Sequence, residues 1–324
     1  MMKWGIEQIL ILQSIPGLTG LMQFFTFLGH EPFYLFLMPA VFWCLDPSLA
    51  RRMAVVLIAS NGLNGLFKIA FHLPRPSWID PRIKVLSLEK SYGLPSGHAM
   101  NAVAFWGFLA AQIKKWWGWL IAMALILIIS LSRLYLGVHF SIDLLAGWAL
   151  GVLFLGIFLT WESSLISWLK GLTFKQHLGL TVGLACLYLF LFNGILLLLA
   201  PFPDPAVWAQ NAALSGLTPV GAPAINPRNP EYSATLAGTI IGLGLAFSLS
   251  GFHLKEFQAG GSGLKRALRF TIGVGGIVIL AIGLKRITPL DPLALVMVGR
   301  MVRYALIAFW IFYLAPVLFI RIKI

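Results

Sequence analysis

An all-α, polytopic membrane protein is the fold class that the sequence predicts, and three observations predict it. Of the 324 residues, 59% are hydrophobic and only 11% are charged. The mean hydropathy is +0.87. The apolar residues lie in long runs that short polar stretches separate. A water-soluble core of this size could not hide so much apolar surface, so we expect helices that cross a bilayer.

The apolar runs predict about nine transmembrane helices. They are expected near residues 21–44, 53–72, 96–113, 120–135, 140–161 and 178–200, then at 233–252, in a run ending near 284, and at 301–320. Before them, residues 4–20 are interrupted by polar residues, Pro and Gly, which favours a short helix lying in the membrane interface. In the run at 233–252, Gly238, Gly242 and Gly244 are expected to allow close helix packing.

Prolines predict where two of these helices end and begin. The second helix must stop near His72, because Pro74 and Pro76 forbid its continuation. The charged loop at 77–94 is then expected to be exposed to solvent. Pro95 suits the first turn of the third helix, where its missing N–H costs nothing.

Two polar stretches differ in character from the apolar runs. At the start of the third helix, the backbone N–H groups of Ser96 and Gly97 are expected to be unpaired, which would make a ready anion site. Residues 201–231 are rich in Pro and Asn and predict a surface loop.

The formal net charge of +13 is scattered between the apolar runs and forms no basic stripe, which argues against nucleic acid as a partner. Basic loops instead indicate the cytoplasmic side of a membrane protein. If the helices alternate, the basic segments at 51–52, 114–115, 170–175, 255–269 and 321–323 share that side. The motifs described next then face the extracytoplasmic side, although the basic residues between 285 and 303 count against this orientation.

The segment 132–143 places polar groups where its flanks predict membrane, and polar groups at that depth need a reason. His139 and Asp143 stand at i and i+4, so on a helix the carboxylate can hold one ring nitrogen while the other points outward. This is typical of a nucleophile or base with its orienting partner. The alternative is a buried structural His–Asp pair that caps a helix start.

Two further segments add cations and a second imidazole. Lys68 precedes Arg75-Pro76, and Pro95-Ser96-Gly97-His98 opens the third helix. Arg75 and Arg133 offer planar forks that suit paired phosphate oxygens, and Lys68 adds a third positive charge. With these cations a phosphate site requires no metal, and the sequence has no carboxylate cluster that could hold one.

Each of these residues also has a structural alternative. Lys68 or Arg75 alone would be read as an interfacial anchor, and Gly97 as a packing residue. Ser132 could bond back to its own helix. His30, His72, His177 and His253 have no partner in the sequence pattern and are interpreted as interfacial structure.

Together the segments read K-x6-RP, PSGH and SR-x5-H-x3-D, which resembles the three-part signature of the type 2 phosphatidic acid phosphatase (PAP2) family, membrane relatives of vanadium haloperoxidases. The resemblance covers about residues 60 to 150. It implies that His139 is the nucleophile and passes through a phosphohistidine, with Asp143 fixing its tautomer. It implies that His98 is the general acid and then the base. Phosphate would be bound by Lys68, Arg75, Arg133, Ser96 and Gly97, and the motif-supporting positions are Pro76, Pro95 and Ser132.

Two closer likenesses leave the substrate open. Residues 89–100 and 131–139 look like sphingosine-1-phosphate phosphatases, except that Gly97 stands where those carry Thr. Residues 63–68 and 75–78 look like glucose-6-phosphatase. We expect a metal-independent lipid phosphate phosphatase without a cofactor, acting on a sphingoid-base phosphate, phosphatidic acid or isoprenoid (di)phosphate.

The alternatives are a hydrolase of soluble sugar phosphate, a phosphotransferase, and a non-hydrolytic transporter of anionic lipid, against which the missing inverted repeat counts. The expected partners are membrane lipids, and the sequence predicts no oligomeric state. We expect a catalytic membrane core at residues 1–165 and additional transmembrane helices of unknown role at 166–324.

Overall fold

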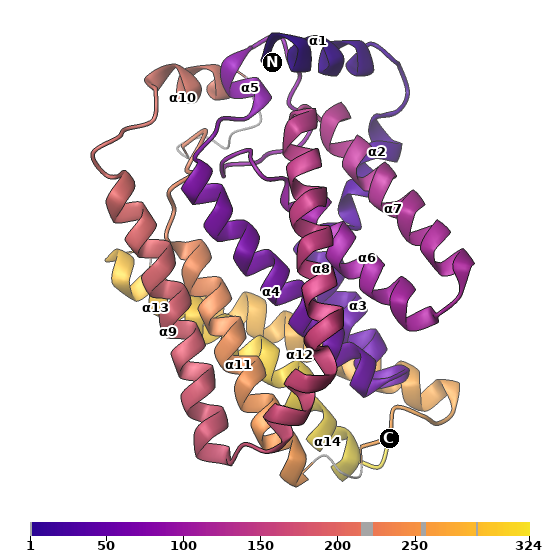
Figure 1. Cartoon of the computed structure of the whole chain (residues 1–324). Coiled ribbons are helices and arrows are strands. Elements are labelled where there is room, and N and C mark those ends of the chain that lie inside the picture. The colour runs from indigo at the N-terminus through magenta and orange to yellow at the C-terminus, as the bar shows by residue number, and fades with distance from the viewer. Residues whose placement is uncertain (1, 215–222, 254–256, 290) are drawn as a thin grey trace. The chain divides into compact units, whose positions relative to one another are not determined.

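The structure is a computed structural model that describes residues 2–214, 223–253, 257–289 and 291–324. Within these ranges the chain forms helices joined by turns and loops, and it contains no strand (Figure 1). The predicted all-α class is confirmed. Seven helical segments of the described chain are long and apolar enough to cross a membrane: Pro47–Ile79, Trp116–Tyr135, Ser141–Lys170, Phe174–Leu199, Glu231–Ser250, Gly263–Ile287 and Leu293–Arg321.

The number of membrane-length helices in the described chain is lower than the expected nine, and two of the expected helices show a local cause. The first expected helix is divided into α2 (Thr19–Phe27) and α3 (Glu31–Cys44), with the break at residues 28–30. The third, α6 (Gly97–Ile113), has 17 residues. At about 1.5 Å per residue it is roughly 26 Å long, slightly less than the ~30 Å of bilayer hydrocarbon.

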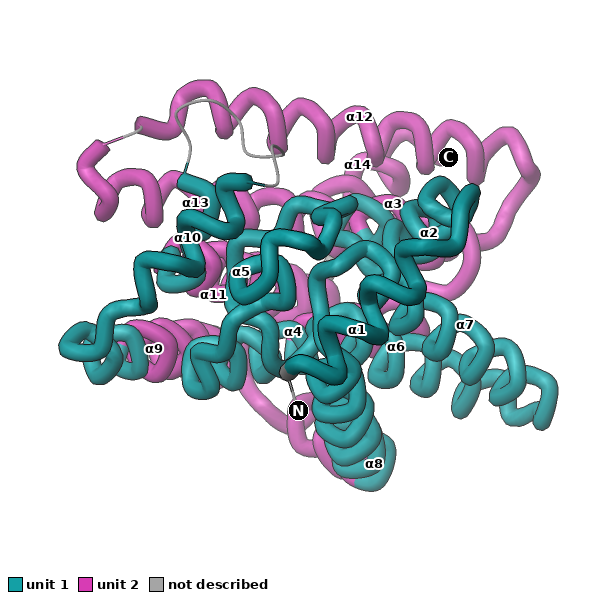
Figure 2. Tube along the Cα trace, turned by 90° about the horizontal axis from the view of Figure 1, so that it is seen from above, with its two compact units in different colours: residues 1–34, 59–160, 194–229 teal, residues 35–58, 161–193, 230–324 magenta. Residues whose placement is uncertain are grey.

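The chain forms two compact units, which Figure 2 colours separately. Unit 1 contains residues 1–34, 59–160 and 194–229, and unit 2 contains residues 35–58, 161–193 and 230–324. Every residue of the three motifs lies in unit 1. The expected division into a catalytic core and an extension at residue 165 concerns function, and it stays a prediction.

In unit 1, α7 (Trp116–Tyr135) packs against α6 and α2. Two apolar clusters of buried side chains fix this arrangement: Ala102, Val103, Ile126 and Ile129 in one, and Met22, Tyr135, Leu136 and Val138 in the other. A third cluster joins α1 (Met2–Gln13) to Phe140, directly before α8 (Ser141–Lys170). The segment between α7 and α8, which carries His139, is therefore anchored by apolar packing on both sides.

One further helix of unit 1 lies far along the chain. The short α10 (Ala206–Ala213) packs on α5 (Pro76–Ile79), beside which Figure 1 shows it. Residues 201–231 were predicted to be a surface loop, and the described part of that stretch contains this helix.

In unit 2 the closest packing joins α11 (Glu231–His253) and α13 (Leu293–Phe309). A Cβ atom at Gly238 or Gly242 would clash with the backbone of Met301 or Ala305, so the predicted role of these glycines in helix packing is confirmed. Unit 2 also contains α12 (Gly263–Ile287), the π-helix η1 (Trp310–Leu314), α14 (Ala315–Arg321), and most of α3 and of α9 (Phe174–Leu199). The Trp310 indole joins η1 to α12 by donating to the Gly273 carbonyl at 2.8 Å.

Candidate active site

The first two cations are placed by the end of one helix and the start of the next. The helix α4 (Pro47–Phe71) ends just before the prolines that predicted its end, and Lys68 lies in its last turn. Arg75 has extended backbone (φ −87°, ψ 160°), as a residue before proline prefers. Pro76 then opens α5. Arg75 is only 2% exposed, so its charge must be compensated by nearby groups.

The start of α6 differs from the expected anion site. Ser96 is the N-cap, and its hydroxyl accepts from the Ala99 N–H at 3.4 Å. The Ser96 N–H donates to the Asp143 carbonyl at 2.9 Å, so the prediction that it is unpaired was wrong. A Cβ at Gly97 would lie 2.9 Å from Asn64 Oδ1, which supports the packing interpretation of this glycine. The Pro95-Ser96-Gly97 stretch thus ties α6 to α8.

His139 and Asp143 meet as their spacing predicted. Nδ1 of His139 lies 3.1 Å from Asp143 Oδ2, and the same oxygen accepts from the Phe140 N–H at 2.9 Å. The carboxylate therefore caps the start of α8 and also orients the imidazole, so this geometry is compatible with both alternatives of the sequence analysis. With the proton on Nδ1, the Nε2 lone pair faces Arg75, whose Nη1 lies 3.3 Å away.

The electrostatic surroundings keep His139 neutral. Its side chain is 2% exposed. Burial, followed by the positive charges of Arg75, Lys68 and Arg133, lowers the pKa of His139 well below its ordinary value. A neutral imidazole whose Nε2 carries no proton can act as a nucleophile at neutral pH.

The loop after α5 accepts hydrogen bonds from both Lys68 and Arg75. Lys68 Nζ donates to the carbonyls of Tyr92 at 2.7 Å and Gly93 at 3.2 Å. Arg75 Nε donates to the Ser91 carbonyl at 2.6 Å, and its Nη2 donates to the Ser91 hydroxyl at 3.0 Å. The prediction that residues 77–94 are exposed was wrong for this part, because Tyr92 is buried. The loop turns inward and offers its carbonyls to the cations.

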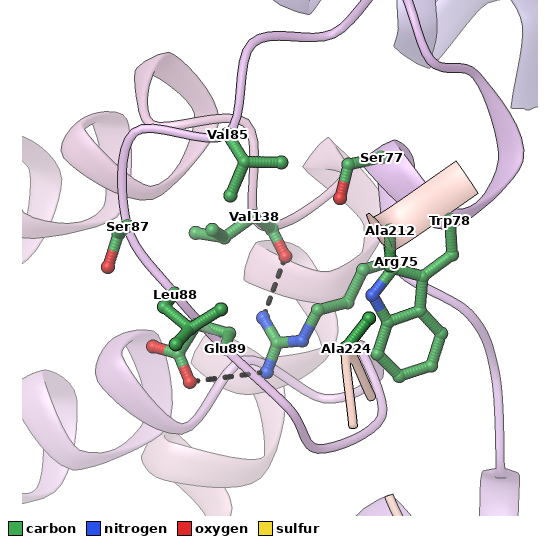
Figure 3. A pocket seen from close by; sticks show the side chains of 10 residues that line it. All are labelled: Arg75, Ser77, Trp78, Val85, Ser87, Leu88, Glu89, Val138, Ala212 and Ala224. Atoms are coloured by element: carbon green, nitrogen blue, oxygen red, sulfur yellow. Dashed lines mark hydrogen bonds and ion pairs between the residues drawn. The ribbon is translucent and has the colours of Figure 1, made fainter. Parts of the chain in front are cut away.

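Glu89, from the same loop, joins the two arginines of the motifs. One carboxylate oxygen accepts from Arg133 Nη2, and the other lies 3.6 Å from Arg75 Nη2, a contact visible in Figure 3. Burial by itself raises the pKa of Glu89, but the guanidiniums of Arg133 and Arg75 outweigh it and hold the pKa well below its usual range. The ionised carboxylate therefore holds the two guanidiniums as an oxyanion would.

Two buried polar atoms near these groups have no hydrogen-bond partner among the described residues: Nε of Arg133 and Nε2 of His98. Arg133 is fully buried, and its Nη1 donates to the Thr26 hydroxyl. Both Arg133 and His98 are near enough to His139 to lower its pKa. Unpaired buried groups are rare, and an oxyanion bound beside them would accept from Arg133 Nε, and from His98 Nε2 when that nitrogen carries a proton.

His98 has a neighbour that the sequence did not predict. Its ring meets the edge of the His30 ring, with centroids 4.8 Å apart and planes at 82°. A Cβ at Gly29 would clash with the His98 ring, so only glycine allows this approach. His30 was interpreted as interfacial structure, and that interpretation missed its contact with His98.

Ser132 makes the bond back to its own helix that the sequence analysis gave as its structural alternative. Its hydroxyl donates to the Ile129 carbonyl at 2.6 Å, within its own helix. The residues that the sequence missed are Glu89, Ser91, Tyr92, Thr26 and His30. The only available signal was the presence of Glu89 and Tyr92 in an otherwise unassigned loop that lies between two motifs.

A pocket opens onto this cluster from one side (Figure 3). Arg75 and Glu89 lie on its wall, together with Trp78 of α5. Ala212 and Ala224, both from the stretch that contains α10, also line it. The pocket thus lies beside the Arg75 side chain.

We expect a Glu89→Gln variant to unfold at a lower temperature, by on the order of 5 °C, because two buried guanidiniums lose their counter-charge. Inorganic phosphate should raise the unfolding temperature of Glu89→Gln by more than it raises that of the wild type. Because the pKa of Glu89 is depressed, its stabilisation is complete above the ordinary Glu value of about 4.3 and is lost as the pH falls further. The difference between the two proteins should therefore narrow below that pH.

Thermal unfolding of the detergent-solubilised proteins, with and without phosphate, would measure these shifts. Glu7→Gln is the matched control, since Glu7 also pairs with an arginine, Arg82 at 3.4 Å, but both side chains are 60% exposed. A Glu89→Gln protein as stable as the control, at every phosphate concentration, would show that Glu89 is not the counter-charge of the two arginines.

Comparison with known proteins gives two family matches. The sequence profile of the PAP2 superfamily matches residues 49–166, and that of the PAP2 superfamily phosphatase transmembrane extension matches residues 234–324. With the seven long apolar helices, the second match indicates an integral, multi-pass membrane protein. No solved structure matches the chain.

Several curated proteins are similar to the chain. Lipid phosphate phosphatase delta of Arabidopsis thaliana is 31% identical over 165 residues, which are 46% of this chain and 38% of that protein. Sphingosine-1-phosphate phosphatase 2 of Mus musculus is 34% identical over 137 residues, 39% of this chain and 38% of that protein. Phosphatidylglycerophosphatase B of Bacillus subtilis is 30% identical over 165 residues, 46% of this chain and 77% of that protein. The chain therefore spans less than half the length of the first two relatives.

Proposed function

Because the chain belongs to the PAP2 superfamily, we propose that it is an integral-membrane lipid phosphate phosphatase that works through a phosphohistidine on His139. One observation carries the proposal: the Nε2 lone pair of a neutral His139 faces the Arg75 guanidinium, with the unpaired Arg133 Nε in the same cluster. A nucleophile next to cations of this kind suits an electrophilic phosphorus atom that carries anionic oxygens.

In the first step, Nε2 of His139 attacks phosphorus, and the bond from phosphorus to the leaving oxygen breaks. Arg75, Arg133 and Lys68 hold the phosphoryl oxygens, and the phosphate displaces Glu89 from the two guanidiniums. His98, in its protonated form, gives its proton to the leaving oxygen. Asp143 keeps the Nδ1 proton in place and stabilises the charge that develops on the ring.

In the second step, the neutral His98 takes a proton from water as the water oxygen attacks the phosphohistidine. The bond from nitrogen to phosphorus breaks, its electron pair returns to Nε2, and inorganic phosphate leaves. The cycle restores both imidazoles. The cations Lys68, Arg75 and Arg133 supply the positive charge that a metal supplies elsewhere and would repel a divalent ion, so we propose a metal-independent reaction.

A lipid phosphate is the proposed substrate class, because the relatives are named for lipid phosphate, sphingosine 1-phosphate and phosphatidylglycerophosphate. We also propose that the site faces the extracytoplasmic side, on the distribution of the basic loops. Lys114 and Lys115, at the end of α6 opposite its Ser96 N-cap, support this orientation.

The test is phosphate release by the detergent-purified protein in excess EDTA. The substrates are a sphingoid-base phosphate, phosphatidic acid, undecaprenyl diphosphate and glucose 6-phosphate. We expect turnover of at least one lipid substrate that chelation does not reduce. A preference for glucose 6-phosphate would replace the lipid assignment with a soluble sugar phosphate. Binding of phosphate without release from any substrate would contradict the hydrolase and favour a transporter.

A further inference from the structure

A stretch outside both family matches reaches the candidate site. Residues 199–214 and 223–229, here called the strap, lie between the matched segments that end at 166 and begin at 234. They nevertheless belong to the same compact unit as the motif residues. The strap is about a hundred residues further along the chain than the loop it contacts, so its presence there requires specific interactions.

The first contact joins α10 to α5, the turn that follows Arg75. Nδ2 of Asn211 donates to the carbonyls of Trp78 at 3.0 Å and Ile79 at 3.2 Å. The rings of Trp78 and Trp208 pack with centroids 6.0 Å apart. The two carbonyls lie at the end of α5, so Asn211 satisfies acceptors that a helix leaves unpaired.

The second contact is a polar cluster of the buried Tyr92 with Asp204 and Arg228, whose side chains are partly buried. The Tyr92 hydroxyl donates to Asp204 at 2.9 Å and accepts from Arg228 Nε at 2.8 Å. Arg228 also pairs with Asp204 at 2.9 Å. Its remaining N–H groups donate to the carbonyls of Leu199 at 2.7 Å and Phe202 at 2.5 Å. Each member is thus held by the others, which makes such a network rigid.

The protonation state of Tyr92 keeps the hydrogen bonds of this cluster in place. Burial, and to a smaller extent Asp204, raises the pKa of Tyr92 to about 12, although Arg228 opposes the shift. The hydroxyl therefore stays protonated and keeps donating to Asp204 at physiological pH. A backbone bond from the Asn226 N–H to the Lys90 carbonyl, at 3.1 Å, adds a link beside it.

The loop that the strap holds is the loop that orients the cations. The Tyr92 carbonyl accepts from Lys68 Nζ, and Ser91 accepts from Arg75 through both its carbonyl and its hydroxyl. The side chain of Tyr92 thus contacts the strap while its backbone contacts Lys68. A shift of this loop by a fraction of an ångström would move both cations with it.

We propose that the strap is a positioning element of the site: Tyr92, Asp204 and Arg228 hold the loop at 89–93 in the geometry that presents Lys68 and Arg75 to the substrate phosphate. The inference rests on the proposed function for the identity of the substrate, but it concerns residues that touch no reacting atom. It predicts that the strap acts on phosphate affinity only through the two cations.

The experiment compares Tyr92→Phe, which keeps the ring, with Arg228→Met and the conservative Arg228→Lys. We expect kcat/KM to fall about 10-fold in Tyr92→Phe and about 30-fold in Arg228→Met, with partial recovery in Arg228→Lys. The inhibition constant of inorganic phosphate should rise by similar factors. Arg300→Met is the matched control, because Arg300 loses an ion pair with Glu231 of similar length, 2.7 Å, in unit 2. It should stay within about 2-fold.

A double-mutant cycle separates positioning from general support. In a Lys68→Met background, adding Arg228→Met should cost less than about 5-fold, since one of the two cations that the strap positions is already gone. Full additivity with Lys68→Met would overturn the proposal. So would an unchanged phosphate inhibition constant in folded Tyr92→Phe and Arg228→Met proteins.

The failure of the inference and of the proposed function can be told apart. If the wild type releases no phosphate, the proposed function fails. The stabilisation of each protein against heat by inorganic phosphate still measures the effect of the strap on phosphate binding. A smaller phosphate-induced shift in Arg228→Met than in the wild type and Arg300→Met supports the inference. Equal shifts overturn it.

Discussion

We expect a His139→Ala variant to release phosphate at about 10⁻⁴ of the wild-type rate or less, which is the size of loss found when a catalytic nucleophile is removed. The geometry gives the reason, since Nε2 of His139 is the lone pair that faces Arg75, and Asp143 holds the opposite nitrogen. Asp143→Asn should lose less, about 10²- to 10⁴-fold, because it disturbs the tautomer and keeps the nucleophile.

The measurement is phosphate release in EDTA with the substrate that the wild type prefers. His177→Ala is the control, because it removes an imidazole from unit 2 and should leave the rate unchanged. Trapping a phosphorylated wild-type protein in acid-quenched samples, and its absence in His139→Ala, would identify the intermediate. A His139→Ala rate above about 1% of wild type would exclude His139 as the nucleophile.

The second large effect is expected from Arg133→Lys, which keeps the charge and loses the planar fork. We expect kcat/KM to fall about 10²- to 10³-fold. Arg133 bonds to both Thr26 and Glu89, and its Nε has no partner within the described part of the chain. A lysine has only one nitrogen to replace these three. The fall should come with weaker inhibition by inorganic phosphate.

Arg82→Lys is the matched control, because Arg82 also pairs with a carboxylate, Asp80, but is 60% exposed. Its kcat/KM should change less than about 2-fold. Circular dichroism and thermal unfolding would establish that both variants are folded. If the Arg133→Lys protein is folded and keeps both its kcat/KM and its phosphate inhibition, then Arg133 does not bind the phosphoryl group.

The sequence was informative where chemistry and local geometry coincide. The i, i+4 spacing predicts the His139–Asp143 contact, although His139 lies just before α8 and the contact forms at the start of that helix. The end of α4 follows from Pro74 and Pro76. The unpaired N–H predicted at Ser96 was wrong for a tertiary reason. The start of α8 comes close enough for its Asp143 carbonyl to accept that bond, and no pattern within residues 95–98 contains this information.

Glu89 and His30 were missed for the same reason. The pairing of Glu89 with Arg133 joins residues 44 positions apart, and a loop without periodicity gives no signal for it. Similarly, the break between α2 and α3 reduces the number of membrane-length helices, but it also brings His30 against His98. The interruption of the apolar run can be read from the sequence, but the contact between His30 and His98 that it allows cannot.

The polar cluster of Tyr92, Asp204 and Arg228 also sets the order in which the site can be completed during synthesis. Tyr92 and Asp204 are separated by 112 residues, and Tyr92 and Arg228 by 136. At about 5–20 residues per second, the ribosome needs roughly 7–27 s to reach Arg228 after Tyr92 has been made. Within that interval α6, α7 and α8 are synthesised, while the loop that contacts Lys68 and Arg75 still lacks its anchor. Assembly of the cation site is therefore a late event, even though its motifs lie in the first half of the chain.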